Sequence, residues 1–355
     1  MEGSSSISLK RTYRLFVSTW NVGGLLPSDD AELEEWLDIK NGHYDIYILG
    51  FQEVVPLNAR NVLGPKNRRV LERWSSLIRK SLNKLPSSKL HEGKQKVHPM
   101  KEEEEEEKEG GHAQEFECVA SKQMVGILVS VWARSDLRRC ISHRSIACVG
   151  CGVMGCLGNK GSVSIRFLLH ETSFCFACCH FASGGKEGDE VKRNTNAMEI
   201  LSRTTFPSSP PPPLDLPQKI TDHDRVFLFG DLNYRISLPN ASTRSLMEQN
   251  RWSILLQKDQ LRMEFSKGKL FEDWQEGAIT FFPTYKYYLN SDKYYGCVPT
   301  QKSGKSRAPA WCDRILWRGE GINQERYDRC ELRLSDHRPV RGIFAVDVDV
   351  PKSSS

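Results

Sequence analysis

The sequence lacks any hydrophobic run long enough to cross a bilayer as a helix. Its longest apolar stretch, Val125 to Ala133, has the length of a strand, whereas a spanning helix needs about 20 apolar residues. Residues 1–6 contain neither the basic nor the apolar region of a secretory signal peptide, and residues 352–355 form no prenylation box. We therefore expect a cytoplasmic protein, with peripheral membrane contact and the nucleus as open alternatives.

The sequence also has little net charge and no block of basic residues. Its 50 Lys and Arg against 45 Asp and Glu give a formal charge of +5, and the basic residues are scattered. This balance does not predict a nucleic-acid partner, but it is compatible with an anionic substrate in a local cationic pocket. The 11 cysteines are expected to be reduced thiols, because their number is odd and no secretory signal is recognised.

What is present is a succession of short apolar runs and amphipathic segments. Apolar or β-branched runs of strand length cover residues 15–20, 46–51, 125–132, 161–169, 174–179, 226–230 and 314–317. Helical patterns cover residues 31–39, 68–82, 187–203 and 245–257. This alternation predicts an α/β protein in which helices cover two sheets.

Two stretches interrupt the pattern and are predicted to be loop insertions. The first, residues 86–112, contains six consecutive glutamates, Glu102 to Glu107, which repel one another and stay solvated. The second, residues 206–217, contains four consecutive prolines, Pro210 to Pro213, and is expected to be extended. We therefore predict a single domain over residues 8–348 with insertions at these two places.

Polar residues follow several of the predicted buried strands at their carboxyl ends. Asn21, Glu53, His180 and Asp231 all occupy such positions. In layered α/β proteins ligands and catalytic groups gather at the carboxyl ends of strands. We expect these four side chains to belong to a single site.

The segment from Phe229 to Arg235 places a carboxylate, Asp231, at a strand end and an amide, Asn233, two residues later. Because Leu232 points away between them, both polar groups face the same side. The carboxylate can take a proton from water, while the amide orients that water or a phosphate oxygen. An Asx-turn that ends the strand explains this segment about equally well when it is taken alone.

Three further acidic positions suit phosphate and metal chemistry. Asp336 precedes His337 before a predicted strand, so the acid can lie near a metal while the imidazole contacts a phosphate oxygen, although a surface turn is the alternative. Asp313 leads the strand over 314–317 and can hold the His337 ring in one tautomer. Glu53 suits Mg²⁺, which binds few protein oxygens and keeps several waters.

Two cysteine pairs have zinc-like spacing, Cys148 with Cys151 and Cys175 with Cys178. Cys175 and Cys178 fall within one predicted strand, where residues three apart face opposite sides. They cannot both bind one ion without a bulge. We therefore expect these cysteines to be small core residues.

Several sequence blocks resemble the signatures of the inositol polyphosphate 5-phosphatases, the plant enzymes in particular, and occur in the family's order between Tyr13 and Val346. These blocks are Trp20-Asn21, Gln52-Glu53, Gly230 to Arg235, Pro309 to Arg314, and Ser335 to Pro339. The Asn-Tyr-Arg and Pro-Ala-Trp-Cys-Asp-Arg stretches are the most specific; the others also occur in the wider group of Mg²⁺-dependent endonuclease-like phosphoesterases. The resemblance implies a four-layer α/β/β/α sandwich of the DNase I-like type.

The resemblance also implies roles for individual residues. The residues implied to bind Mg²⁺ or lie beside it are Glu53, Asn21 and Asp336. Those implied to act on water or the scissile phosphate are Asp231 as general base, Asn233, His180 and His337, with Asp313 orienting His337. The residues implied to bind the substrate are Tyr285, Lys286, Lys305 and Arg307 at the neighbouring 4-phosphate, together with Arg235, Asn159 and Lys160. Ser162 stands where the family usually has a glycine, so the backbone of that loop departs from the pattern.

These observations predict Mg²⁺-dependent hydrolysis of the 5-phosphate of phosphoinositide lipids, of soluble inositol polyphosphates, or of both, by in-line attack of an activated water. We find no Cys-x5-Arg loop that would form a covalent phospho-enzyme. Two alternatives remain open at this point: a related metal-dependent phosphodiesterase or nuclease, and a non-catalytic phosphoinositide-binding module. The sequence leaves the preference between lipid and soluble substrates open, as it does the oligomeric state.

Overall fold

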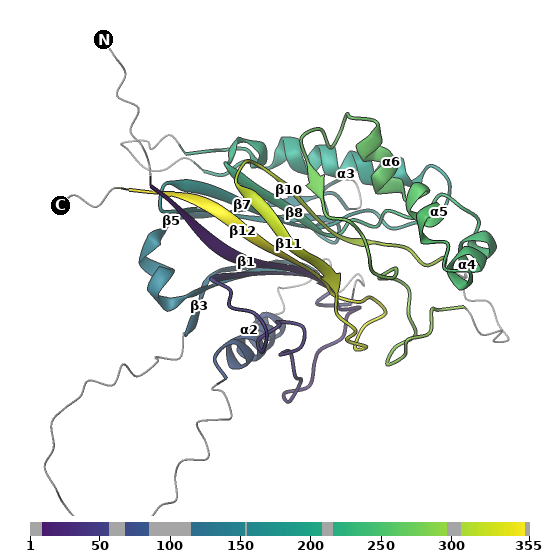
Figure 1. Cartoon of the computed structure of the whole chain (residues 1–355), viewed down its shortest axis with the longest axis horizontal. Coiled ribbons are helices and arrows are strands. Elements are labelled where there is room, and N and C mark those ends of the chain that lie inside the picture. The colour runs from purple at the N-terminus through teal and green to yellow at the C-terminus, as the bar shows by residue number, and fades with distance from the viewer. Residues whose placement is uncertain are drawn as a thin grey trace, which may run out of the picture.

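The computed structural model describes residues 9–56, 68–84, 115–152, 155–207, 216–296 and 307–351, and its described strands form two six-stranded sheets. The first sheet has the order β11 (Ile322–Arg329), β12 (Val340–Val350), β1 (Leu9–Asn21), β2 (Ile46–Gln52), β4 (Ile127–Arg134), β3 (Phe116–Met124). The second has the order β5 (Ile141–Gly150), β6 (Gly161–Leu169), β7 (Thr172–His180), β8 (Arg225–Asp231), β10 (Asp313–Arg318), β9 (Gln275–Glu276). Figure 1 shows the two sheets stacked face to face.

Each sheet contains one parallel strand pair near its centre, and its other described pairs are antiparallel. In the first sheet β1 runs parallel to β2, with Asn21 opposite Gln52. In the second sheet β7 runs parallel to β8, with His180 opposite Asp231. The two strands of a parallel pair end at the same edge of the sheet, so each pair delivers its terminal residues to one place.

The main core lies between the two sheets. The inward faces contribute large apolar side chains that are fully buried, among them Ile48, Val129, Phe176 and Phe344. The rings of Phe176 and Phe227 stack with their centres 5.2 Å apart. Phe227 also makes an edge-to-face contact with Phe344, which lies on the other sheet, at 5.0 Å between ring centres. Burial of this apolar surface stabilises the stacking of the sheets.

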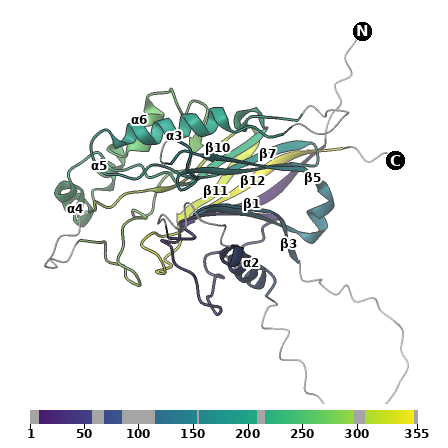
Figure 2. The ribbon, with the colours of Figure 1, turned by 180° about the vertical axis from the view of Figure 1, so that it is seen from behind.

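The outer face of each sheet is covered by a separate layer. On the first sheet, Trp74 of α2 (Arg68–Leu82) packs against Trp20 and Phe51. On the second sheet, α3 (Asp189–Arg203) and α6 (Gln260–Ser266) bury residues such as Ile200 and Leu261. Figure 2 shows α2 and α3 on opposite sides of the stack. The predicted four-layer α/β/β/α sandwich is confirmed.

Two of the predicted helices are wrong in part. Residues 34–41 form consecutive turns, because the Ile39 amide bonds five residues back to Glu34 O and Asp38 has a φ of +53°. The single helix predicted over 245–257 is two helices, α4 (Asn240–Glu248) and α5 (Trp252–Gln257). Asn250 separates them with a φ of +53°, a left-handed conformation that a helix does not accommodate.

The prediction that the cysteines with zinc-like spacing are core residues is confirmed for Cys151, Cys175 and Cys178, which are buried. It is wrong for Cys148, which is exposed because it lies on the edge strand β5. Cys178 lies in the core between the sheets, whereas Cys175 lies in the cluster under α3 and α6, so the two face opposite sides of β7. The acidic run Glu102 to Glu107 and the proline run Pro210 to Pro213 lie outside the described residues. Across the described ranges, no helix is long and apolar enough to span a membrane.

Candidate active site

The carboxyl ends of the two parallel strand pairs meet, and they bring together the polar residues predicted at strand ends. Asn21 Nδ2 donates to Asp231 Oδ2 at 2.9 Å and to Glu53 Oε1 at 3.3 Å. His180 Nε2 lies 3.4 Å from Asp231 Oδ2 and 3.8 Å from Glu53 Oε1. One site therefore spans the interface between the sheets, with two residues from each.

Asp231 lies at the centre of this site and is only 2% exposed. Burial pushes its pKa up, but the hydrogen bond with His180 and the charge of His337, whose Nε2 is 4.0 Å away, outweigh burial. The net result is a pKa of Asp231 below its ordinary value. Its carboxylate is therefore ionised at neutral pH, the state that a general base requires.

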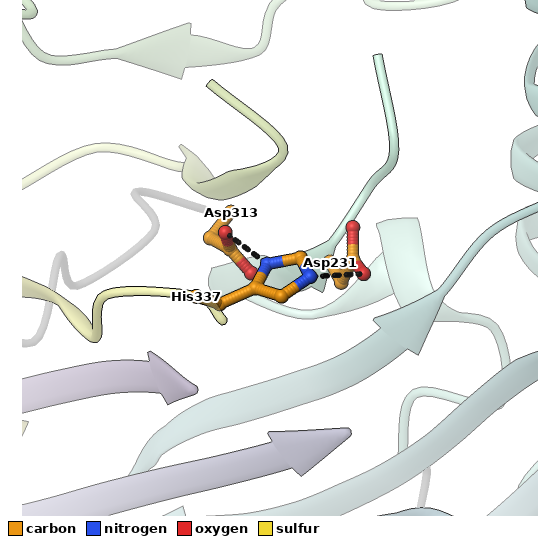
Figure 3. A group of neighbouring side chains, drawn as sticks. All are labelled: Asp231, Asp313 and His337. Atoms are coloured by element: carbon orange, nitrogen blue, oxygen red, sulfur yellow. Dashed lines mark hydrogen bonds and ion pairs between the residues drawn. The ribbon is translucent and has the colours of Figure 1, made fainter. Parts of the chain in front are cut away.

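A second carboxylate, Asp313, is held against the imidazole of His337 (Figure 3). The β8–β10 register places Asp313 opposite Asp231, and Asp313 Oδ2 lies 2.8 Å from His337 Nδ1. The same oxygen accepts a hydrogen bond from Thr284 Oγ1 at 2.6 Å. This arrangement fixes the ring orientation that the sequence predicts for His337.

The Asp313–His337 pair shares one proton. Burial raises the pKa of Asp313, although His337 and Thr284 oppose that rise. Burial lowers the pKa of His337, but the Asp313 carboxylate outweighs it and raises that pKa to about 9. We place the proton on the imidazole, because the two hydrogen bonds that Asp313 Oδ2 accepts favour its ionised form.

The position of a metal can be argued from the same geometry. Asp231, Asp313 and His337 offer atoms within 4.8 Å of one another, a spacing that would allow a shared ion. A protonated imidazole has no lone pair to give, however, so these three side chains form a charge-paired group instead. Glu53 fits a hard cation better, because its side chain is 32% exposed and borders the cleft.

Asn233 and Arg235 form the wall beside Asp231. Asn233 adopts a φ of +57°, and its main-chain N–H donates to Asp231 Oδ1 at 3.1 Å. Arg235 Nη2 donates to Asn233 Oδ1, and its guanidinium lies 4.5 Å from the centre of the Tyr285 ring. Arg235 therefore braces Asn233 and Tyr285, and it also borders the cleft.

Asp336 is paired with a lysine, which differs from the expected neighbourhood of a metal. Lys286 Nζ lies 2.5 Å from Asp336 Oδ2, and Ser335 Oγ donates to the other carboxylate oxygen at 3.4 Å. Burial lowers the pKa of Lys286, but Asp336 outweighs it, and the net pKa is raised. Lys286 is thus charged and stands at the edge of the cleft.

Lys160 approaches the carboxylates of Asp231 and Glu53 from the loop before β6. Its Nζ lies within hydrogen-bonding distance of His180 Nε2. Burial lowers the pKa of Lys160 to about 8, although Asp231 and Glu53 oppose the shift. Asn159 borders the same cleft, and its buried Oδ1 accepts no hydrogen bond within the described part of the chain.

These residues line a cleft of about 640 Å³. Of the predicted site residues, it is bordered by Glu53, Asn159, Lys160, His180, Asp231, Asn233, Arg235, Tyr285, Lys286, Arg307, Asp336 and His337. Asn21 and Asp313 lie behind this surface, in contact with Asp231 and His337 respectively. Lys305 lies outside the described residues.

The structure adds residues that the motifs did not indicate. Tyr288 and Tyr295 border the cleft with ring centres 5.0 Å apart, and Lys286 Nζ lies 5.5 Å from the Tyr295 ring. Thr284 holds Asp313, as described above. The density of tyrosines between residues 285 and 295 is the sequence signal for the first two; Thr284 has none, because its role depends on the fold.

Comparison with known sequences places the chain among enzymes. It matches the family model described as Endonuclease/Exonuclease/phosphatase family 2 over residues 18–343. It is 54% identical to type IV inositol polyphosphate 5-phosphatase 9 of Arabidopsis thaliana, over 96% of this chain and 79% of that protein. It is 46% identical to type I inositol polyphosphate 5-phosphatase 8 of the same plant, over 98% of this chain and 73% of that protein.

Solved structures agree with this kinship. The inositol polyphosphate 5-phosphatase domain of SPsynaptojanin, in complex with inositol (1,4)-bisphosphate and calcium ion, superposes with a TM-score of 0.76 at 29% identity, covering 97% of this chain and 87% of that one. Cimex nitrophorin shares the fold alone, with a TM-score of 0.64 at 19% identity. Because identity to the plant enzymes extends over nearly the whole chain, the chain belongs to the inositol polyphosphate 5-phosphatase family.

Proposed function

We propose that this protein hydrolyses the 5-phosphate of phosphorylated inositols by a single in-line attack of water. The observation that carries the proposal is the position of the buried, ionised Asp231 between His180 and His337 at the base of the cleft. Family membership supports the same reaction. A buried base between two imidazoles suits the activation of water beside a phosphate.

Asp231 accepts the proton of the attacking water in this mechanism. Its lowered pKa keeps it ionised, and Asn21 fixes the orientation of its Oδ2. The protonated His337 presents Nε2 toward the same space and donates to a phosphate oxygen, because Asp313 already occupies Nδ1. Preorganised donors of this kind stabilise the charge that develops on the phosphoryl oxygens.

His180, Asn233 and Lys160 complete the set of phosphate donors. His180 Nε2 lies 3.4 Å from Asp231 Oδ2, and Lys160 Nζ lies within hydrogen-bonding distance of His180 Nε2. Asn233 Nδ2 donates to Phe181 O, and its own N–H holds Asp231, so Asn233 couples the base to the loop after β7. Positioning and electrostatics of this kind are the main demands of phosphoryl transfer.

Glu53, with Asn21 beside it, would hold the divalent cation, which we propose to be Mg²⁺. Glu53 borders the cleft, and its exposed carboxylate is the hard oxygen donor that this ion prefers. When bound, the cation neutralises negative charge on the phosphate and the leaving oxygen. Asp336, which is paired with Lys286 in this structure, would also be free to bind the cation if a substrate phosphate took its place on the Lys286 ammonium. The calcium ion in the related synaptojanin structure supports a divalent cation here.

Lys286 and Arg307 are the proposed contacts to the phosphate next to the scissile one. Both border the cleft, and Tyr285 lies between Arg235 and His337, with its ring 4.5 Å from each. Cationic side chains of this kind donate to phosphate oxygens, arginine in a planar fork. The inositol (1,4)-bisphosphate in the related structure carries a 4-phosphate and no 5-phosphate, as a product of this reaction would.

Phosphate release from a small panel of substrates tests the proposal. The panel contains inositol 1,4,5-trisphosphate, inositol 1,4-bisphosphate, and phosphatidylinositol 4,5-bisphosphate in vesicles, each with Mg²⁺ and with EDTA. We expect metal-dependent release only from the two 5-phosphorylated compounds, and the ratio of their rates gives the preference between soluble and lipid substrates. Release from neither compound by the folded protein would contradict the proposal.

A further inference from the structure

Arg244 lies on α4, outside the motifs that the sequence analysis identified, yet its guanidinium joins two segments of the cleft wall. Nη2 donates to the main-chain oxygen of Arg307 at 2.8 Å and to that of Tyr295. Nε donates to Asn240 Oδ1 at 2.9 Å, one turn earlier on the same helix, and this contact orients the guanidinium plane. A single side chain therefore sets the separation between the backbones of Tyr295 and Arg307.

Both segments that Arg244 holds contribute to the substrate cleft. The side chains of Tyr295 and Arg307 border it. Tyr295 is also tied to Lys286, because the Tyr295 amide donates to Lys286 O at 2.7 Å and Lys286 Nζ lies over the Tyr295 ring. The two main-chain oxygens that accept hydrogen bonds from Arg244 thus belong to the part of the cleft that contains Lys286 and Arg307.

Helix α4 is itself anchored to the catalytic loop. Ser237 N donates to Lys258 O at 2.7 Å, and Gln260 N donates to Arg235 O at 2.8 Å. These two hydrogen bonds join the beginning and the end of the segment that contains α4 and α5, and they attach it to the end of the Asp231–Arg235 loop. Arg244 therefore connects the loop that carries the general base to the wall that carries Arg307.

We propose that Arg244 is a positioning residue for substrate selection, which holds Arg307 and Tyr295 at the distance needed to bind the phosphate next to the scissile one. The proposal rests on the proposed function of this site. Arg244 acts through Arg307 and Tyr295. The guanidinium serves three acceptors from two nitrogens, Nε and Nη2, that are fixed in one plane, whereas lysine has a single nitrogen on a flexible stem.

The test is a comparison of two soluble substrates with Arg244→Ala. For inositol 1,4,5-trisphosphate we expect KM to rise roughly tenfold while kcat changes less than about twofold, since binding geometry is lost and the catalytic residues are intact. For inositol 1,5-bisphosphate, which lacks the 4-phosphate, we expect KM to stay within about twofold of the wild-type value. Arg244→Lys should restore only part of the loss.

A double-mutant comparison separates positioning from a general loss of structure. Because Arg307→Ala removes one of the two side chains through which Arg244 acts, Arg244→Ala should raise KM by clearly less than about tenfold in an Arg307→Ala background. Arg262→Ala, which removes an exposed arginine from α6, is the matched control and should leave both KM values unchanged. Melting temperatures of all variants establish that they are folded, and Arg244→Lys takes the place of Arg244→Ala if the alanine variant is not.

The outcomes are distinct. An equal rise of KM for both substrates, full additivity with Arg307→Ala, or no change at all would overturn the role of Arg244 and leave the proposed function standing. A wild-type protein that hydrolyses neither compound would contradict the proposed function itself, and the role of Arg244 with it.

Discussion

His337 and Asp231 carry opposite charges 4.0 Å apart because each has a further partner that fixes its protonation state. Asp313 keeps the imidazole protonated, and His180 and Asn21 keep the carboxylate ionised. One group is thus ready to accept a proton while its neighbour is ready to donate a hydrogen bond. Neighbouring groups whose pKa values are pushed apart in this way are typical of acid–base sites.

The Asp313–His337 pair makes a prediction about pH. The pKa of His337 is raised to about 9, above its ordinary value of about 6.5, so its ion pair stabilises the fold fully below about pH 6.5 and is lost as pH rises through about 9. Asp313→Asn should lower the pKa of His337 by at least about one unit, because the carboxylate is removed.

An NMR titration of the imidazole signals checks this shift, with His337→Gln used to assign the signal of His337. A His337 signal that titrates at the same pH in wild type and Asp313→Asn would contradict the assignment of the proton to the imidazole.

Glu53 makes a prediction about the metal. Glu53→Gln keeps the shape of the side chain but removes its charge, so the Mg²⁺ concentration that gives half-maximal activity should rise about tenfold or more. Activity measured against a series of Mg²⁺ concentrations tests this, with Glu171→Gln at an exposed position as the control. An unchanged Mg²⁺ dependence in Glu53→Gln would place the cation elsewhere.

At the scale of elements, the first sheet packs closely against the second at Gly50 of β2. A methyl group at this position would lie 2.5 Å from the Phe229 ring and 2.7 Å from Cys178 Sγ, both on the opposite sheet. Gly50→Ala should therefore destabilise the fold by about 1–3 kcal/mol through overpacking. Urea denaturation measures the difference. Gly185→Ala is the control, since a methyl group there meets nothing within 4 Å, and equal stability of the two variants would refute the close approach.

The accuracy of the sequence predictions followed burial. Strands buried on both faces, such as β2, β7 and β8, contain continuous apolar runs and were predicted correctly. The edge strands β3, β5 and β11 have exposed polar residues and gave no such run. The turns over 34–41 bury Trp36 and Leu37 side by side, which imitates a helical pattern.

The residues of the candidate site likewise differ in whether the sequence alone could identify them. Residues at the ends of buried strands, such as Asn21 and Asp231, could be found from the sequence because chemistry and position coincide there. Thr284 and Arg244 could not, since their partners lie 29 and 63 residues away in Asp313 and Arg307. Contacts of that range depend on how loops pack, and no local pattern encodes them.

At the scale of the molecule, Asn83 connects the two chain segments that lie on either side of the predicted insertion over 86–112. Its Nδ2 donates to Phe116 O at 3.1 Å, and its Oδ1 accepts from Phe116 N at 2.7 Å. The chain therefore leaves α2 and enters β3 at the same point. A short connection is sufficient to join these elements.

Replacement of residues 86–112 by a Gly/Ser linker of about six residues should leave the melting temperature unchanged and activity within about twofold. Thermal denaturation and phosphate release measure both properties. A variant that fails to fold would show that these residues belong to the domain itself, and the prediction of an insertion would be wrong.

The central claim is that Asp231 activates water for removal of the 5-phosphate, and the identity of the product tests it most directly. Inositol 1,4,5-trisphosphate is incubated with Mg²⁺ and either wild type or Asp231→Ala, and the inositol bisphosphate isomers are separated. The account predicts inositol 1,4-bisphosphate alone, at a rate about a thousandfold lower in the variant. Release of the 1- or 4-phosphate, or an Asp231→Ala variant as active as wild type, would contradict it.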